Sequence, residues 1–492
     1  MITLAEAAQA TGGSWLAQPL PPETPLRGGA FDTRALGDAA IFFALSGAAN
    51  DGHAYLPRLA GSAVRLAVVA RAAPLGDYAG AVLRVADPLA ALADLARFAV
   101  ARHRPAVVAI TGSYGKTTAK EVIAHVLAGA CTVLKSPGSL NNEIGVPITL
   151  LGLDGTQRVA VLEYSARKPG DIDYLGRIAP PDVAVLLAVG QAHIGVFGSQ
   201  EAIFRTKGEI FHHLRPGGTA VVGAAQPRLR ALAAPHPTLS FGRDAGDFHA
   251  ADVAFDDEGR QRFTGVRAGP AGSGAVCLPL HAGMPGPHGC EPVLAAWAVA
   301  HALAPTLGLS AAQADALLAQ RGGVQPRQKG RLRIVPAAGG ATLIDDCYNA
   351  SPETVVNLIE TLNARPEGDK VLVLGPLAEL EEGLRDSARA IATHLAPPLS
   401  RCIVYEPRGE VLSGPLRAGA QGVPVQTVTD AATLHAALRE LDAPGRIIGV
   451  KGARSAHMER FILALQGASV ACRRDPCPLL KYCTDCELLG SP

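Results

Sequence analysis

Short apolar runs alternate with helix-like periodicity along this chain, and this alternation limits the possible folds more than any other feature. In the middle of the chain, VVAIT (107–111), VAVLE (159–163) and VAVLLAV (183–189) each precede a segment with apolar residues at helical spacing. A second series begins at ATLID (341–345) and continues to RIIGVK (446–451). Strands that alternate with helices in this way form a parallel sheet with helices on both faces. The sequence therefore predicts an α/β protein.

The length of the chain predicts several domains. Its 492 residues correspond to about three domains at roughly 150 residues each. The Gly/Pro-rich stretch 265–289 is predicted to be mostly loop. We expect an N-terminal domain over residues 1–103, a central P-loop domain over 104–325, a C-terminal Rossmann-like domain over 326–468 and a cysteine-rich tail over 469–492.

Composition and charge exclude several classes of protein. Hydrophobic residues make up 48% of the chain and charged residues 18%, which suits a large buried core. The net charge is +1 and no long Lys/Arg run occurs, so a nucleic-acid partner is not expected. The chain has no run of about 18 apolar residues without charge, so no membrane span is expected. The N-terminus lacks the features of a signal peptide. We expect a cytoplasmic protein and, since nothing suggests a self-complementary interface, a monomer.

The stretch GSYGKTT (112–118) joins a predicted strand to a predicted helix, which is where a phosphate-binding loop belongs. Lys116 would reach phosphate oxygens, and the Thr117 hydroxyl would bind Mg²⁺. The pattern G-x-x-x-x-G-K-[ST] is incomplete, because Ile110 stands at its first glycine, so an incidental turn is the alternative. The predicted nucleotide contacts of this loop are Gly112, Ser113, Gly115, Lys116, Thr117 and Thr118.

Polar side chains also follow two other predicted strands. Glu163 ends VAVLE and His193 follows VAVLLAV, so both should lie at the same sheet edge as Thr117. A carboxylate beside phosphates is a candidate Mg²⁺ ligand. Lys207 lies on the helix that follows His193. Taken singly, each of these residues has a plainer alternative role: a solvated carboxylate, a structural histidine or an exposed helical lysine.

These segments together resemble the Mur ligase family over roughly residues 25–466. TGSYGKTTAKE (111–121) is similar to the family's short phosphate loop, which also lacks the first glycine. AHIGVFGSQEAIFRTKGE (192–209) resembles the family's metal-site segment, in which the lysine that matches Lys207 is carbamylated. The resemblance implies two Mg²⁺ ions, held through Thr117, Glu163, His193 and the Lys207 carbamate.

Two further segments resemble the substrate-binding parts of one branch of the family, which adds D-alanyl-D-alanine to a UDP-linked muramoyl peptide. FDTRALGDAAIFFALSGAANDGHAYL (31–56) is similar to its UDP-binding domain, and SLNNEIGVPITLL (139–151) is similar to a segment distinctive of this branch. The resemblance implies substrate contacts by Thr33, Arg34, Asn141 and Asn142.

The C-terminal part also resembles the family, in GRLRIV (330–335), LIDDCYNASPETV (343–355) and VKGARS (450–455). The resemblance implies that Lys451 and Arg454 approach the amine substrate. It implies nucleotide contacts by His288, Arg331, Asp346, Tyr348 and Asn349, brought over ATP by domain closure.

The implied reaction is ATP-dependent amide formation with Mg²⁺ as cofactor. The γ-phosphate passes to a carboxylate while Lys116 and Mg²⁺ neutralise charge, and an amine such as D-alanyl-D-alanine then attacks the acyl phosphate. The chain departs from the family pattern at Ala188, Pro287, Gly289 and Pro292, where the family has asparagine or arginine. Two alternatives therefore stay open: a related ligase for another carboxylate and amine, and an inactive scaffold.

The tail contains four of the nine cysteines, in the spacing C-x4-C-x5-C-x2-C. This tail is not part of the family pattern. The spacing suggests a zinc or iron–sulfur site, and a disordered or redox-reactive tail is the alternative. The candidate ligands are Cys472, Cys477, Cys483 and Cys486.

Overall fold

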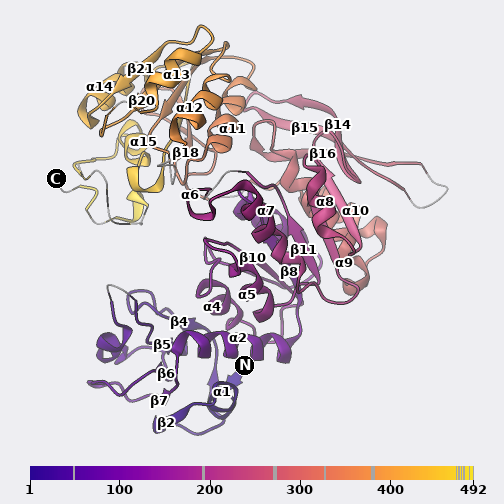
Figure 1. Ribbon diagram of the computed structural model, residues 1–492, viewed down its shortest axis with the longest axis vertical. Coiled ribbons are helices and arrows are strands. Elements are labelled where there is room, and N and C mark those ends of the chain that lie inside the picture. Colours follow the sequence, from indigo (N-terminus) through magenta and orange to yellow (C-terminus); the bar gives the residue numbers. More distant parts are fainter. Residues whose placement is uncertain are drawn as a thin grey trace. The chain divides into compact units, whose positions relative to one another are not determined.

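The protein forms two compact units in the computed structural model (Figure 1). Unit 1 contains Met1–Ala188, Phe204–Phe241 and Ala295–Arg321, and unit 2 contains Val189–Ile203, Gly242–Leu294 and Gly322–Pro492. The structure describes residues 1–47, 50–190, 194–269, 274–325, 328–377, 383–409, 411–472, 474, 477, 479, 482–486 and 488–490.

Unit 1 begins with a 5-stranded sheet in the order β2-β7-β6-β5-β4. Only β2 runs antiparallel to its neighbour; the other pairs are parallel. Helix α2 (Pro88–His103) begins where the Asp87 carboxylate accepts from Leu89 N, and its apolar face is buried. The other elements are β1 (Ile2–Thr3), α1 (Leu4–Thr11), β2 (Ser14–Ala17), β3 (Pro25–Leu26), β4 (Gly29–Ala30), β5 (Ile41–Phe43), β6 (Leu66–Val69) and β7 (Ala81–Arg84).

The second sheet region of unit 1 is parallel, with its strands side by side in the order β13-β12-β11-β8-β10-β9. Glu163 at the end of β10 pairs with Ile110 of β8, and Leu186 of β11 pairs with Thr111. The carboxyl ends of these three strands therefore share one edge. The strands are β8 (Ala106–Thr111), β9 (Val133–Lys135), β10 (Val159–Glu163), β11 (Val183–Leu186), β12 (Thr219–Gly223) and β13 (Thr238–Gly242). The helices are α3 (Lys116–Leu127), α4 (Gly145–Leu150), α5 (Asp171–Ile178), α7 (Gln200–Gly208) and α8 (Pro227–Ala233).

The prediction that 265–289 is mostly loop is wrong. Strands β14 (Phe248–Phe255), β15 (Arg260–Arg267) and β16 (Val276–Pro285) pair antiparallel. Strand β16 ends the sheet order, and an edge strand tolerates prolines because one row of its N–H groups needs no partner. Gly and Pro therefore hid a real strand from the sequence pattern.

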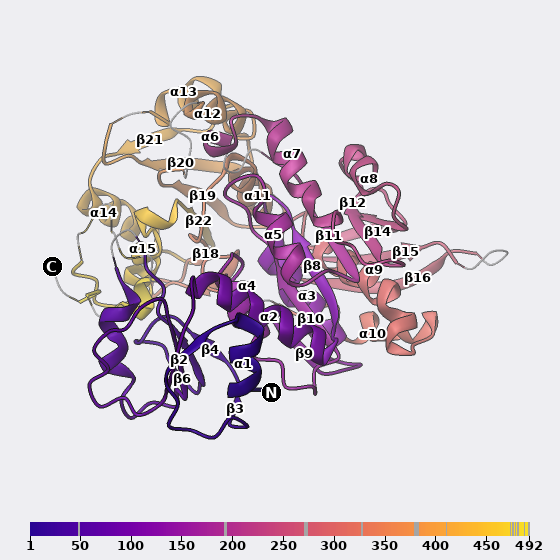
Figure 2. The same cartoon turned by 60° about the horizontal axis from the view of Figure 1, so that its bottom comes forward.

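Unit 2 contains a 6-stranded sheet in the order β17-β18-β22-β19-β20-β21, in which only β17 is antiparallel. One apolar cluster joins the sheet to α14 and α15, and another joins it to α11 and α12 (Figure 2). The strands are β17 (Arg333–Pro336), β18 (Thr342–Asp346), β19 (Asp369–Leu374), β20 (Leu399–Tyr405), β21 (Val425–Val428) and β22 (Arg446–Lys451). The helices are α11 (Pro352–Asn363), α12 (Leu384–Ala392), α13 (Ser413–Gly419), α14 (Ala431–Leu441) and α15 (Glu459–Leu465).

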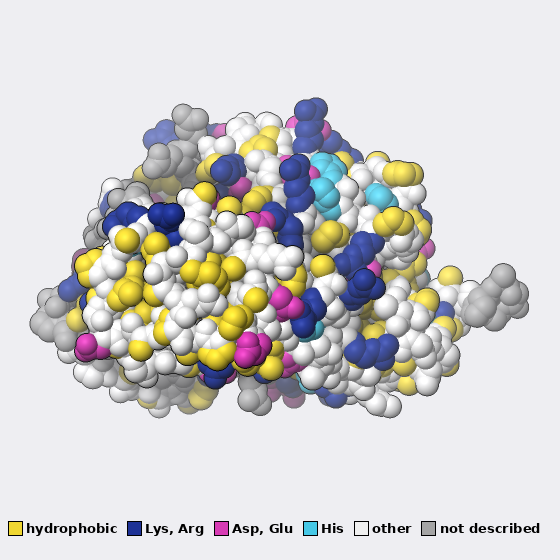
Figure 3. Space-filling model, turned by 90° about the horizontal axis from the view of Figure 1, so that it is seen from below, with side chains coloured by type: hydrophobic (Ala, Val, Ile, Leu, Met, Phe, Trp, Pro, Cys, Tyr) yellow, Lys and Arg dark blue, Asp and Glu magenta, His cyan; other side chains and the backbone are white. Residues whose placement is uncertain are grey.

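Two observations bear on membranes and nucleic acids. Helix α9 (Cys290–Leu307) has the length and apolar character of a membrane span, but 67% of it is buried in the protein, as in a core helix. On the face shown in Figure 3, Lys and Arg side chains are interspersed with acidic and uncharged ones. Among the described residues of that face, Lys and Arg do not form the continuous basic stripe that binding to a phosphate backbone needs.

Candidate active site

The phosphate loop links the buried end of β8 to the first turn of α3. Gly112 and Gly115 have φ of 154° and 78°, which favour glycine. A Cβ at Gly112 would also lie 3.2 Å from Ala188 O. Ser113 N donates to that same oxygen at 2.7 Å. Since α3 begins without a side-chain cap, the N–H groups of its first turn can bind an anion.

Lys116 holds its ammonium group over this loop. Its Nζ donates to Gly112 O at 2.7 Å and to Ser113 O at 3.4 Å. The charge therefore already lies where the loop would hold a phosphate, and phosphate oxygens can replace these carbonyls. Thr117 and Thr118 follow it and are 2% and 6% exposed.

Glu163 carries a buried carboxylate at the end of β10. Its Oε1 accepts from Asn141 Nδ2 at 2.8 Å, while its Oε2 has no hydrogen-bond partner within the part of the chain that the structure describes. A buried carboxylate oxygen without a partner is costly unless a cation binds it. This oxygen and the Thr117 hydroxyl are the oxygen donors that Mg²⁺ prefers, so the two residues fit that ion.

Lys207 on α7 is 2% exposed, and its pKa is lowered to about 7. Burial is the largest cause, and the ammonium of Lys116 also lowers it, while Glu209, Asp171 and Glu163 act in the opposite direction. Lys207 is therefore near enough to Lys116 and Glu163 for their charges to affect its pKa. Because the side chain is buried, the alternative of an exposed helical lysine is wrong.

His193 lies outside the described residues, so its proposed role stays a prediction. The helix that carries Lys207, α7, ends at Gly208, and a 3₁₀ turn, Glu209–Phe211, follows it. In that turn Glu209 accepts from Gly170 N at 2.8 Å and from Asp173 N at 3.1 Å. Glu209 therefore ties the end of α7 to the start of α5.

Lys120 is a residue that the sequence reasoning missed. It lies one turn after Lys116 on α3, is fully buried, and donates to Ser136 O at 2.7 Å and Gly138 O at 2.6 Å. Burial lowers its pKa, while Glu163 opposes the shift. Lys120 thus anchors the segment that leads to Asn141. The available signal was a second lysine four positions after Lys116, on a mostly apolar helix.

The predicted substrate-binding residues occupy two segments of unit 1. Asn142 Oδ1 accepts from Gly145 N at 3.0 Å, at the start of α4. Arg34 forms a two-bond ion pair with Asp32, and its side chain is 76% exposed. Thr33 lies between them. Gly28 N donates to Leu151 O at 2.8 Å, which fixes this part of the N-terminal sheet to the end of α4.

In unit 2, Asp346 and Lys451 lie side by side at the ends of β18 and β22 and form an ion pair. Leu332 N also donates to Asp346 Oδ1 at 3.2 Å. Burial raises the pKa of Asp346, and Lys451 opposes this shift. The guanidinium of Arg331 lies 4.2 Å from the centre of the Tyr348 ring. The structure thus joins Lys451 to the residues predicted to contact nucleotide.

Arg454 and Asn349 complete the predicted set in this part. Arg454 pairs with Glu459 and donates to His457 Nδ1 at 2.7 Å, whereas Asn349 is exposed. The Tyr482 ring of the tail lies 4.7 Å from the Arg454 guanidinium. The tail therefore contacts the C-terminal candidate residues.

His288 lies in the segment where the chain departs from the family pattern. Its Nε2 is 3.0 Å from Glu360 Oε2 and its Nδ1 is 3.6 Å from Glu291 Oε1. These carboxylates raise its pKa, Glu291 most. Gln261 Nε2 donates at 3.0 Å to the carbonyl oxygen of Pro287, the residue before His288. The segment is thus held to α11 and β15.

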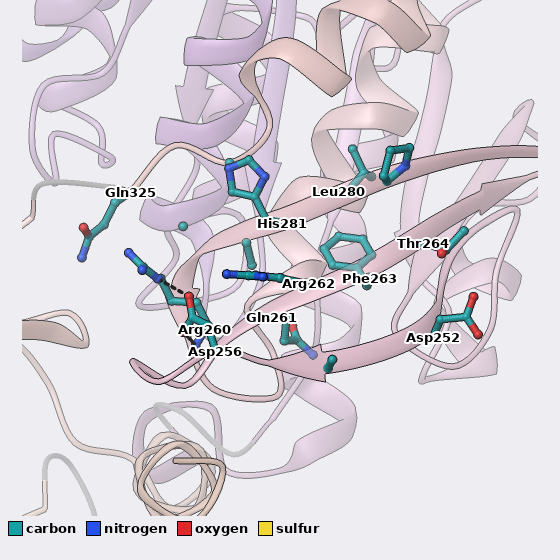
Figure 4. A pocket seen from close by; sticks show the side chains of 15 residues that line it. Asp252, Asp256, Arg260, Gln261, Arg262, Phe263, Thr264, Leu280, His281 and Gln325 are labelled. Carbon is teal, nitrogen blue, oxygen red and sulfur yellow. Dashed lines mark hydrogen bonds and ion pairs between the residues drawn. The ribbon is translucent and has the colours of Figure 1, made fainter. Parts of the chain in front are cut away.

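A cavity of about 740 Å³ lies along β14, β15 and β16 (Figure 4). Its charged lining includes Asp256 and Arg260, which are paired at 2.9 Å, with Arg262 and His281 nearby. None of the predicted site residues lines it. Its size alone therefore does not connect it with the phosphate loop.

Known proteins resemble the chain over most of its length. Residues 110–300 match the Mur ligase middle domain, and residues 330–454 match the Mur ligase, glutamate ligase domain. UDP-N-acetylmuramoyl-tripeptide–D-alanyl-D-alanine ligase of Mycobacterium tuberculosis is 34% identical, over 87% of this chain and 89% of the relative. The ligase of the same name from Escherichia coli is 31% identical, over 88% and 92%.

Solved structures agree with these relatives. MurF from Acinetobacter baumannii superposes with a TM-score of 0.79 at 31% identity, over 95% of this chain and 99% of that one. MurF ligase from Thermotoga maritima in complex with ADP gives 0.75 at 28% identity, over 90% and 97%. The predicted α/β architecture is confirmed by these matches, and neither family match extends into the cysteine-rich tail.

Proposed function

The chain belongs to the Mur ligase family, and on this basis we propose that it joins D-alanyl-D-alanine to a UDP-N-acetylmuramoyl tripeptide with the use of ATP. The observation that carries the proposal is that Lys116 and the buried Glu163 carboxylate lie at the same end of β8 and β10, with the buried Lys207 near enough for both charges to affect its pKa. A cation, a carboxylate and a neutral amine in a buried phosphate site suit phosphoryl transfer to a carboxylate.

In the proposed reaction, a carboxylate oxygen of the tripeptide attacks the γ-phosphorus of ATP, and ADP leaves. The amine of D-alanyl-D-alanine then attacks the carbonyl carbon of the acyl phosphate. Phosphate leaves with its bonding electron pair, the amine loses a proton, and an amide results. Lys116 and the N–H groups at the start of α3 hold the transferred phosphate and stabilise its charge.

Thr117 and Glu163 are the residues that would hold Mg²⁺, which when bound supplies positive charge beside the phosphate oxygens. We propose that Lys207 contributes as a carbamate. Its amine nitrogen forms a bond to CO₂ and releases a proton, which requires the uncharged amine. The lowered pKa of Lys207 supports this step, and the ammonium of Lys116 favours the resulting anion.

The substrate and nucleotide roles of the remaining residues stay predictions. The exposed guanidinium of Arg34 suits contact with the UDP-linked substrate. The Asn141 amide donates to the Glu163 carboxylate, which suits a role in positioning that carboxylate. The Asp346–Lys451 pair and the Arg331–Tyr348 contact lie together in unit 2 and suit a nucleotide or an amine substrate.

Phosphate release with ATP, Mg²⁺, UDP-N-acetylmuramoyl tripeptide and D-alanyl-D-alanine tests the proposal. We expect release only when both substrates are present, and a product with the mass of the pentapeptide. Lys116→Ala should lower turnover at least about 100-fold, whereas Lys135→Ala, at a 46% exposed side chain, should not.

Each contrary result has a distinct meaning. Turnover only with another carboxylate or amine would contradict the proposed substrates and favour the related-ligase alternative. A folded protein that binds ATP but releases no phosphate with any pair would contradict the ligase proposal and favour the scaffold.

A further inference from the structure

The tail brings its four cysteines to one place on unit 2. Cys472, Cys477, Cys483 and Cys486 all line a single cavity of about 20 Å³ beside α15. We propose that this cavity is a zinc site with these four thiolates as ligands, and that it fixes Tyr482 against the C-terminal candidate residues. The zinc proposal stands on the tail alone, while its effect on ATP binding rests on the proposed function.

The backbone of the tail is arranged around this cavity. Cys486 N donates to Cys483 O at 3.2 Å, which closes the tight C-x2-C turn typical of zinc knuckles. Cys472 N donates to Leu489 O at 3.1 Å, so the two ends of the tail are joined. Cys477 N donates to Ser455 O at 3.2 Å, which holds Cys477 against the turn before α15.

The size and the donors of the cavity favour a single zinc ion. A volume of about 20 Å³ holds roughly one water-sized sphere, which suits a single ion. All four cysteines are free thiols, and four sulfur donors suit tetrahedral Zn²⁺. His457 and Glu459 also lie within 4.8 Å of Cys483, but the Arg454 guanidinium is bonded to both, so they are less suitable ligands than the thiols.

The charge around the cavity also suits such a site. Zinc with four thiolates has a net charge of −2. Arg460 and Arg474 line the same cavity, and Arg460 donates to Arg474 O at 2.8 Å. The positive charges of these two residues partly offset this negative charge.

Tyr482 connects this site to the candidate active-site residues. It directly precedes Cys483, and its hydroxyl donates to Asp345 Oδ2 at 2.5 Å. Asp345 also accepts from Gly330 N at 3.1 Å and Cys347 N at 3.3 Å. These two residues flank Arg331 and Asp346 in the chain. A fixed Tyr482 therefore holds both segments that carry the predicted nucleotide contacts, and it is a positioning residue.

Elemental analysis of the full-length chain, purified without added metal, tests the zinc site. We expect one zinc and no iron per chain, lost in Cys472→Ser and Cys483→Ser. Cys277→Ser, at an exposed cysteine outside the cavity, is the matched control and should keep its zinc. Three results would each overturn the proposal. The first is a protein that has reduced tail thiols but neither contains zinc nor takes up added Zn²⁺. The others are bound iron, and zinc that is retained in both tail variants.

Tyr482→Phe tests the coupling separately, because it removes one hydroxyl and no ligand. We expect unchanged zinc content and a roughly tenfold weaker ATP affinity, measured by calorimetry on the full chain without any turnover. Zinc present with unchanged ATP affinity would overturn the positioning role alone. If the wild-type chain keeps its zinc but binds no ATP, the proposed function fails and the zinc site stands.

Discussion

Lowering the pH from 8 to 6 should convert most Lys207 side chains from neutral amines to ammonium ions. The shift of its pKa from 10.5 to about 7 is equivalent to about 5 kcal/mol of lost preference for the charged form. With that pKa, about nine-tenths of the side chains are neutral at pH 8 and about one-tenth at pH 6. The neutral fraction of an ordinary exposed lysine, with a pKa near 10.4, changes about 100-fold over the same interval.

Brief labelling with acetic anhydride at several pH values, in buffer free of CO₂, measures this fraction. The Lys207 peptide is quantified by mass spectrometry, and exposed lysines in the same digest are the internal control. Burial slows the labelling of Lys207 at every pH, so this effect cancels in the ratio of its rates at two pH values. We expect the Lys207 rate to rise about tenfold from pH 6 to 8 and to level off.

Lys116→Met should move the midpoint of this titration upward, because it removes a neighbouring positive charge that lowers the pKa of Lys207. If the Lys207 labelling rate of the wild type instead rises about 100-fold from pH 6 to 8 without levelling off, Lys207 has the pKa of an ordinary exposed lysine. That result would refute the reasoning behind the carbamate.

Three further substitutions test other parts of the site. Glu163→Gln removes the charge that suits Mg²⁺, so the Mg²⁺ concentration for half-maximal phosphate release should rise at least about tenfold; an unchanged Mg²⁺ dependence would contradict its role as a ligand. Asn142→Ala removes the acceptor of Gly145 N and should destabilise the protein by about 1 kcal/mol, seen as a lower Tm in thermal unfolding; an unchanged Tm would exclude this contact. Lys120→Met leaves the buried Ser136 carbonyl and the Gly138 carbonyl without their donor and should cost about 1–3 kcal/mol, again read from Tm, with the exposed Lys135→Met as the control.

The phosphate loop could be predicted because all its parts are neighbours in the chain. An apolar strand, a glycine turn, Lys116 and Thr117 are contiguous, and local backbone geometry fixes their relation. Glu163 was also predictable, since the carboxyl ends of parallel strands meet at one edge. The edge strand β16 was missed because its prolines and glycines are also what a loop contains.

The role of Lys120 could not be predicted in the same way. Its partners are carbonyls 16 and 18 residues away, and although Lys120 stands on a mostly apolar helix, its neighbours in the chain do not reveal these partners. The same holds for Glu459, which is 1% exposed beside Arg454 and His457.

The sequence by itself determined the alternation of strands and helices in the parallel sheets, the phosphate loop and the spacing of the tail cysteines. Each of these depends on residues close together in the chain. Only the tertiary structure decided that Lys207 is buried beside a second ammonium, that Asp346 pairs with Lys451 across 105 residues, and that four cysteines share one cavity. Burial and charge pairing depend on groups that the chain brings together only when it folds, and these set the protonation and ligand chemistry of a site.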